Sequence, residues 1–311
     1  MKIKLYANLQ KGNNGISRYT HTLSKGFNIP ISNAKKIEFT INNKKYLGMI
    51  SHEFFNMFNI LDFNYDIIHS MSALYPHIYS NVLTIHDIVN IENNYNIYRQ
   101  LKYISRIKDI KIIVPLNTVK NDLITKLNFS PDNIFVINHG IEVINPETIN
   151  PYNDYKIHLF LFGGLDGIRR KQQYLLNILK DTNYEVYIAG YGYNSYIDNY
   201  KKYPNIHYLG YLTDKDVYNY MAHSDLLIYN STGEGFGYIP LEAMRFNLTT
   251  VINDKPEFNE VYKNNVYYYD NNFLDVVEFA LYNKKKNLKE FVYNNYPISK
   301  MLSETMRVYK L

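Results

Sequence analysis

Short apolar runs, each about one strand long and separated by helix-length segments, recur along the whole chain. One series occupies the N-terminal half, at 2–7, 66–70, 81–87, 111–115 and 134–140. A second series follows at 158–164, 185–190, 205–210, 225–230 and 249–253. Strands that are apolar throughout are typical of parallel sheets with helices on both faces. The sequence therefore predicts an α/β fold with two doubly wound, Rossmann-like parallel-sheet domains.

The segment 142–156 separates the two series. It holds Pro146 and Pro151 among polar residues and shows no hydrophobic period, which is typical of a linker. We therefore expect an N-terminal domain at 1–145 and a second domain at 146–290.

The C-terminal region reads as helical, and Pro297 interrupts it before a last helix that starts near Ser299. Apolar residues at three- and four-residue spacing share one face of this helix, which indicates packing against a domain. We assign 291–311 to this C-terminal helix, which can cross back to the N-terminal domain.

Composition excludes several classes of function. The 311 residues include no cysteine, so disulfides, thiol catalysis and cysteine metal sites are excluded. No apolar run reaches the roughly 18 residues of a membrane span, and the N-terminus reads as a strand rather than a signal peptide. We expect a cytoplasmic protein, and contact with a membrane surface stays compatible with the composition. The net charge of +5 comes without a long basic block, so we expect no nucleic-acid partner.

Ligands of open parallel sheets bind beyond the carboxyl ends of the strands. After the first strand, Gly12 and Gly15 flank two asparagines and open a helix. Free backbone N–H groups there favour an anion, although the spacing is not G-x-G-x-x-G and an ordinary β–α turn fits too. His86 and Asp87 end a later strand, without the G-x-S-x-G of a serine hydrolase.

Three cations open the first helix of the second domain. Gly163 and Gly164 end the preceding strand, and Arg169, Arg170 and Lys171 follow. Cations at a helix N-terminus oppose the helix dipole, so they do not serve helix stability. A bound diphosphate would neutralise them.

A D-x-D pair, Asp214 and Asp216, has two interpretations. Such a pair can hold a divalent metal, but Thr213 and Asp216 also fit the capping box of a helix start. We favour the capping box and expect no metal, because no other carboxylate cluster accompanies the pair.

The segment 231–244, STGEGFGYIPLEAM, places Glu234 in a loop and Glu242 in the first turn of a helix that Pro240 helps to start. Each carboxylate can accept two hydrogen bonds from a vicinal diol. A glycoside-hydrolase acid/base pair is the competing interpretation, but it gives no role to Arg170 and Lys171.

With these motifs, the second half resembles the retaining glycosyltransferases of family 4, which have the GT-B fold with an interdomain cleft. The resemblance rests on FLFGGLDGIRRKQ, on GEGFGYIPLEAMRFNLTTVINDKPEFNEVY and on the E-x7-E pattern of Glu234 and Glu242. GNNGISRYTHTL, TIHDI and IFVINHGIEV extend it more weakly over the first half. The family often has a glycine where this chain has Asn247.

The resemblance implies four residues that act on the reacting bond. His86 would contact the donor sugar near the reacting carbon, and Glu234 would lie near the hydroxyls of that sugar. Arg170 and Lys171 would stabilise the departing diphosphate.

The resemblance also implies a donor-binding set. Glu242 would bind the ribose hydroxyls, and Tyr211 would help to frame the base. The other members are Gly15, Gly164, Arg169, Gly235, Phe236, Gly237, Tyr238 and Ile239.

The implied function is that of a retaining, metal-independent glycosyltransferase without a cofactor. It would move a hexose from a nucleotide-diphosphate sugar, of the UDP-glucose or GDP-mannose type, to a hydroxyl acceptor on a sugar, a lipid or another molecule. The alternatives are a sugar phosphorylase of the same fold and a non-catalytic basic binding protein.

Overall fold

The chain divides into two compact units. In a computed structural model, the described residues are 1–7, 15–33, 38–41, 44–47, 64–73, 79–88, 95–142, 146–163, 171–192 and 194–311. Unit 1 combines Met1–Gly140 with Ile298–Leu311, and unit 2 comprises Ile141–Pro297. Among the helices so described, none is long and apolar enough to cross a membrane.

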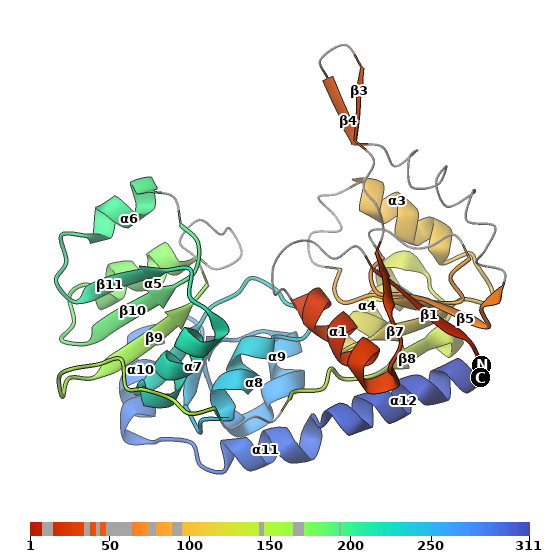
Figure 1. The fold of residues 1–311 in the computed structure, drawn as a ribbon. Helices are drawn as coiled ribbons and strands as arrows, with labels where there is room; N and C mark the ends of the chain where they lie inside the picture. Colours follow the sequence, from red (N-terminus) through yellow and green to blue (C-terminus); the bar gives the residue numbers. More distant parts are fainter. Residues whose placement is uncertain are drawn as a thin grey trace. The chain divides into compact units, whose positions relative to one another are not determined.

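Unit 1 is built on a six-stranded parallel sheet of order β2-β1-β5-β6-β7-β8 (Figure 1). Its strands are β1 (Ile3–Ala7), β2 (Ile31–Asn33), β5 (Ile67–Ser70), β6 (Val82–Thr84), β7 (Lys111–Val114) and β8 (Ile134–Val136). Its helices are α1 (Gly15–Phe27), α3 (Tyr95–Ile104), α4 (Asn117–Leu127) and α12 (Ile298–Lys310). A separate antiparallel hairpin joins β3 (Glu38–Ile41) and β4 (Lys44–Leu47).

Unit 2 repeats the architecture with strand order β11-β10-β9-β12-β13-β14, again all parallel. Its strands are β9 (His158–Phe162), β10 (Glu185–Ala189), β11 (Ile206–Gly210), β12 (Leu226–Tyr229), β13 (Thr250–Asn253) and β14 (Tyr267–Tyr269). Its helices are α5 (Gln172–Leu179), α6 (Asn194–Tyr200), α7 (Asp214–His223), α8 (Tyr238–Met244), α9 (Pro256–Tyr262), α10 (Phe273–Tyr282) and α11 (Leu288–Asn295).

Each of the ten apolar runs forms a strand, so the prediction of two doubly wound parallel sheets is confirmed. The sequence did not predict β2 and β14, which lie at the edges of their sheets. Both strands are only three residues long and mostly partly buried, and neither carries a run of aliphatic side chains.

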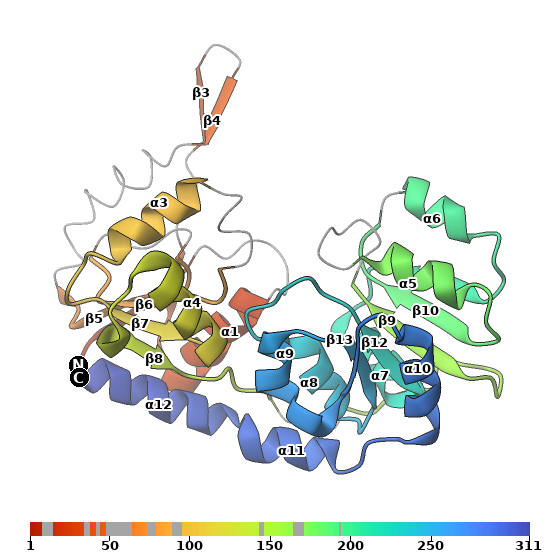
Figure 2. The same ribbon diagram turned by 180° about the vertical axis from the view of Figure 1, so that it is seen from behind.

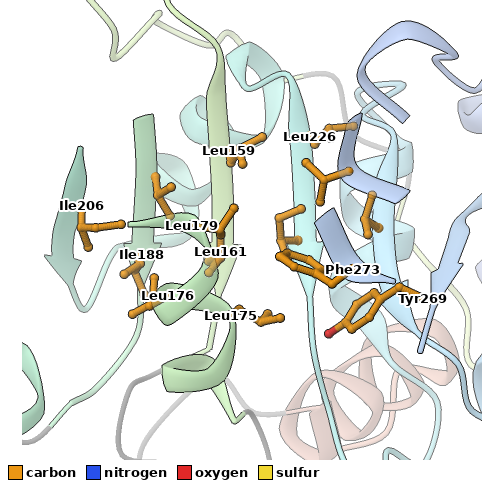
Figure 3. Close-up of a cluster of buried hydrophobic side chains, with 14 of the residues drawn as sticks. Leu159, Leu161, Leu175, Leu176, Leu179, Ile188, Ile206, Leu226, Tyr269 and Phe273 are labelled. Carbon is orange, nitrogen blue, oxygen red and sulfur yellow. The ribbon is translucent and has the colours of Figure 1, made fainter. Parts of the chain in front are cut away.

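The core of unit 2 explains why these segments fold together. Leu159 and Leu161 of β9 pack with Leu175 of α5, and Phe273 of α10 completes the same cluster (Figure 3). The Phe273 ring lies against Tyr269 of β14, with ring centroids 4.9 Å apart. Full burial of one such side chain is worth about 1.5–3 kcal/mol.

The last helix belongs to unit 1, where α12 lies beside α1 (Figures 1 and 2). The predicted apolar face is buried, with Met301 and Val308 in the core of this unit. Tyr309 adds a polar contact, because its hydroxyl lies 2.6 Å from Nδ1 of the buried His69. Nε2 of His69 is 2.7 Å from the hydroxyl of Thr84, so this network ties α12 to β5 and β6.

The Tyr309→Phe variant tests this network. Loss of the hydroxyl leaves one nitrogen of buried His69 unsatisfied, which we expect to lower the free energy of unfolding by about 1–3 kcal/mol. Tyr282→Phe is the matched control, because that side chain is 89% exposed. Urea denaturation measures both variants, and equal losses would contradict the proposed contribution of the network.

Candidate functional site

The loop between β12 and α8 holds the predicted donor motif. Two hydrogen bonds tie it to β13: the Ser231 N–H donates to Oδ1 of Asn253 at 2.9 Å, and Nδ2 of Asn253 donates to the Ser231 carbonyl at 2.7 Å. The Ser231 hydroxyl donates to Glu234 Oε1 at 3.1 Å. The partly buried carboxylate of Glu234 is thus oriented by its own loop.

Gly237 marks the start of α8, and its conformation has a structural cause. Its φ of 78° lies in the left-handed region, and a Cβ there would overlap the hydroxyl of Tyr262. That hydroxyl donates to the Gly237 carbonyl at 2.7 Å. The glycine is therefore required by packing, whether or not a ligand approaches its backbone.

The neighbours of Gly237 divide between core and surface. The Phe236 side chain is buried, and its ring packs against Tyr238 and Tyr296 at centroid distances of 5.6 and 5.5 Å. Tyr238 and Ile239 are partly buried, and Gly235 is buried. Any ligand contact of Gly235 and Phe236 would therefore fall to the backbone.

Glu242 differs from Glu234 in its surroundings. It lies in α8, one turn beyond Tyr238, and only 4% of its surface is exposed. A buried carboxylate is costly unless hydrogen-bond donors surround it. The E-x7-E pair thus combines a partly exposed carboxylate in the loop before α8 with a buried one in the second turn of α8, and not in its first turn as expected.

A hollow of about 380 Å³ opens at the carboxyl ends of β12, β13 and β14. Among the residues that line it are Lys171, Asn230, Ser231, Asn253, Lys255 and Tyr269. Lys171, the N-cap residue of α5, lines the hollow and places a cation there. Two lysines outnumber the one carboxylate of the lining, Asp270, and the other groups are mostly polar, so the hollow suits an anionic, hydroxyl-rich ligand.

Gly164, Arg169 and Arg170 lie outside the described residues. The adjoining Gln172 is buried at the first position of α5. Its Nε2 donates to the carbonyls of Phe162 and Gly163 at 3.2 and 3.3 Å. This side chain fixes the end of β9 to the start of α5, a role that no spacing in the sequence indicated.

An aromatic pair follows β10 and β11. Tyr191 and Tyr211 are 68% and 63% exposed, and their ring centroids lie 5.3 Å apart. Each tyrosine follows a glycine of positive φ at the end of its strand. Tyr211 was expected from the sequence and Tyr191 was not, although both follow a strand in the same Gly-Tyr pair.

In unit 1, His86 follows β6 and Gly15 begins α1. Nε2 of His86 donates to the carbonyl of Met71 at 2.8 Å, which leaves Nδ1 as an acceptor. Burial lowers the pKa of His86 to about 4, so the ring is neutral at pH 7. The ring packs edge-on against Tyr19 and His139, each with centroids 5.1 Å away.

The D-x-D pair is a helix cap, as predicted. The Asp216 N–H donates to the Thr213 hydroxyl at 3.2 Å, and that hydroxyl donates to Asp216 Oδ2 at 2.6 Å. Asp214 and Asp216 lie in the first turn of α7, where their charge favours the helix dipole. In the described part of the chain, no group of three or more His, Asp or Glu side chains could hold a metal ion.

Residues 161–296 match the sequence model of the family described as glycosyl transferases group 1. A 41.2 kDa protein of the cps region of Klebsiella pneumoniae, described as uncharacterized, is 27% identical over 173 residues. The match covers 52% of this chain and 48% of that protein, so the chain spans about half the length of this relative.

Solved structures share the whole fold. HepE from Anabaena, in complex with UDP and glucose, superposes with a TM-score of 0.79 at 14% identity over the full length of both chains. Sucrose-phosphate synthase from Thermosynechococcus elongatus superposes with a TM-score of 0.78 at 12% identity, over 100% of this chain and 98% of that chain. A glycosyltransferase from Rickettsia africae superposes with a TM-score of 0.72 at 19% identity, over 99% of this chain and 98% of that chain.

These likenesses confirm the predicted GT-B fold, with its two parallel six-stranded sheets. The family model that residues 161–296 match is one of glycosyltransferases, the enzyme class expected from the sequence.

The packing at Gly237 can be separated from its backbone conformation. Gly210 also has a positive φ, of 70°, but a Cβ there would meet no atom within 4 Å. We expect Gly210→Ala to cost about 1–2 kcal/mol from the left-handed backbone alone. Gly237→Ala should cost more, because it also displaces Tyr262. Urea denaturation of the two variants checks this order, and the reverse order would contradict the structural role of Gly237.

The stability of unit 1 should fall in mild acid. Burial lowers the pKa of His69 to about 3 and that of His86 to about 4, whereas the unfolded chain protonates near pH 6.5. The unfolded state therefore binds more protons between these values, and the free energy of unfolding decreases as pH drops below 6.5, by about 1.4 kcal/mol per pH unit and histidine.

Thermal melts between pH 7.5 and 5 measure this dependence. His86→Asn should reduce the slope of unfolding free energy against pH by about one proton's worth. His21→Asn, on the exposed side of α1, is the control variant and should leave the slope as it is. A slope that His86→Asn leaves unchanged would contradict the assignment.

Proposed function

We propose that this chain is a retaining glycosyltransferase that moves a hexose from a nucleotide-diphosphate sugar to a hydroxyl acceptor. One observation carries the proposal. A buried carboxylate, a loop carboxylate and a lysine-lined hollow gather at the carboxyl edge of a single sheet, that of unit 2. Each corresponds to one part of such a donor: ribose, hexose and diphosphate.

Glu242 is assigned to the ribose. A vicinal diol can donate two hydrogen bonds to one carboxylate, which suits Glu242 to the ribose hydroxyls. Tyr191 and Tyr211 are assigned to the base, because an exposed aromatic pair offers rings on which a planar base can stack.

Glu234 is assigned to the hydroxyls of the transferred hexose. Its orienting hydrogen bond from Ser231 engages Oε1. A carboxylate held in this way keeps capacity to accept further hydrogen bonds from the sugar.

Lys171, with Arg169 and Arg170, is assigned to the diphosphate leaving group. Negative charge grows on the diphosphate as the glycosidic bond breaks, and preorganised cations at a helix start stabilise it. We propose that these cations make a metal ion unnecessary. The reaction would retain the anomeric configuration, with a diphosphate oxygen taking the acceptor proton on the face that the leaving group departs from.

His86 is assigned to the donor sugar. Because its pKa is low and Nε2 is engaged with Met71, neutral Nδ1 can accept a hydrogen bond from a sugar hydroxyl at pH 7. An imidazolium could not do so. UDP is the first nucleotide to test, because HepE from Anabaena was solved with UDP and glucose.

Thermal shift tests the donor assignment. We expect UDP, GDP or ADP at about 100 times its Kd to stabilise the protein by about 2.7 kcal/mol, seen as a higher Tm. Glu242→Ala should abolish most of the shift, because the ribose loses its carboxylate. The exposed Glu290→Ala is the matched control and should keep the full shift.

The absence of a shift with all three nucleotides would contradict the proposal. A shift with inorganic phosphate alone, followed by phosphate-dependent release of a sugar phosphate, would instead establish a phosphorylase. For a ligand that shifts Tm, hydrolysis of the matching nucleotide sugar then identifies the hexose.

A further inference from the structure

A row of tyrosines and cations runs along the solvent-facing side of α3 in unit 1. Tyr95 and Tyr103 are 71% and 69% exposed, and Tyr98 is exposed between them. Leu101 and Ile104 lie on the opposite side of the helix, and both are buried in unit 1. The exposed positions recur at three- and four-residue spacing, so they share one helix face.

The cations of this segment are Arg99, Lys102, Arg106 and Lys108, and residues 95–108 contain no aspartate or glutamate. The Arg99 guanidinium lies 5.6 Å from the ring centre of Tyr95, and Lys102 Nζ lies 5.9 Å from that of Tyr98. Within the described parts of the chain, neither cation has a carboxylate partner. Among the described residues, no carboxylate neutralises these two charges.

Ordinary solvated helix faces intersperse charges of both signs, so this face departs from them in two respects. From residue 95 to residue 108 its charge has a single sign, with Asp109 following directly, and its large side chains are aromatic with a polar tip. Tyrosine rings of this kind favour the boundary between lipid headgroups and acyl chains. Arginine and lysine stems can lie along the same boundary while their charged ends reach phosphate oxygens.

We propose that the tyrosine–cation face of α3 and of the turn that follows it (Tyr95, Tyr98, Arg99, Lys102, Tyr103 and Arg106) docks unit 1 onto a lipid surface that carries negatively charged phospholipids. The charge complementarity selects anionic lipid, and the rings supply apolar area at the headgroup level. The proposal is independent of the transferase assignment, because none of these residues belongs to the donor site.

Vesicle co-sedimentation of the full chain tests it. We expect the protein to bind vesicles that contain phosphatidylglycerol and not vesicles of pure phosphatidylcholine, with binding weakened by salt. The double variant Arg99→Glu/Lys102→Glu should lower the partition coefficient by roughly tenfold or more, given the contribution of each basic residue near a charged surface. Tyr95→Ser/Tyr103→Ser should weaken binding and leave its salt dependence unchanged.

The matched control is Tyr282→Ser/Lys286→Glu, which changes an exposed tyrosine and an exposed lysine in unit 2. It should bind as the unaltered chain does, and circular dichroism should show all variants folded.

Equal binding to both vesicle types, no binding to either, or an equal loss in the control would overturn the proposal. Full binding by the tyrosine variant would overturn the role of the rings. Binding of a single-stranded oligonucleotide through the same residues, without vesicle binding, would assign the face to nucleic acid instead.

Discussion

One hydrogen bond fixes the start of the helix that carries the second half of the predicted donor motif. The Tyr262 hydroxyl, fully buried on α9, donates to the carbonyl of Gly237 and so fixes the first turn of α8. Burial raises the pKa of Tyr262, so the phenol stays protonated and remains a donor. Glu242 follows on this helix and Glu234 precedes it. The positions of both carboxylates therefore depend on a side chain outside the motif.

The residues proposed to act on the donor have unlike surroundings. In unit 2, two carboxylates and a lysine-lined hollow lie at one sheet edge. In unit 1, the properties of His86 come from its own core: burial keeps the ring neutral, and the Met71 carbonyl selects the tautomer. The Tyr19 ring packs on His86, and the Tyr19 hydroxyl lies 3.3 Å from the hydroxyl of Thr84. Because Thr84 also contacts His69, which contacts Tyr309, His86 belongs to the network that anchors α12. The stability of unit 1 and the position of His86 thus rest on the same contacts.

Much of the fold could be read from pattern. The apolar runs located ten strands, and Thr213 correctly distinguished a helix cap from a metal motif. Asn247 shows why a family glycine can be replaced, because its φ of 56° is one that asparagine tolerates. Spacing could not find the part of the hollow that comes from the ends of β13 and β14. Those residues reach the hollow through strand order, which brings together segments far apart in the chain.

The sequence by itself determined the fold class of the protein and the edge of each sheet where a ligand would bind. A strand that is apolar at every position must be covered on both faces of its sheet. In such parallel sheets, ligand-binding residues lie in the loops that follow the strands. Only the tertiary structure decided that Glu242 is buried while Glu234 is partly exposed, since exposure depends on what distant segments place over a side chain. It also decided that α12 packs in unit 1, because an apolar stripe specifies that a helix must be buried but not against which core.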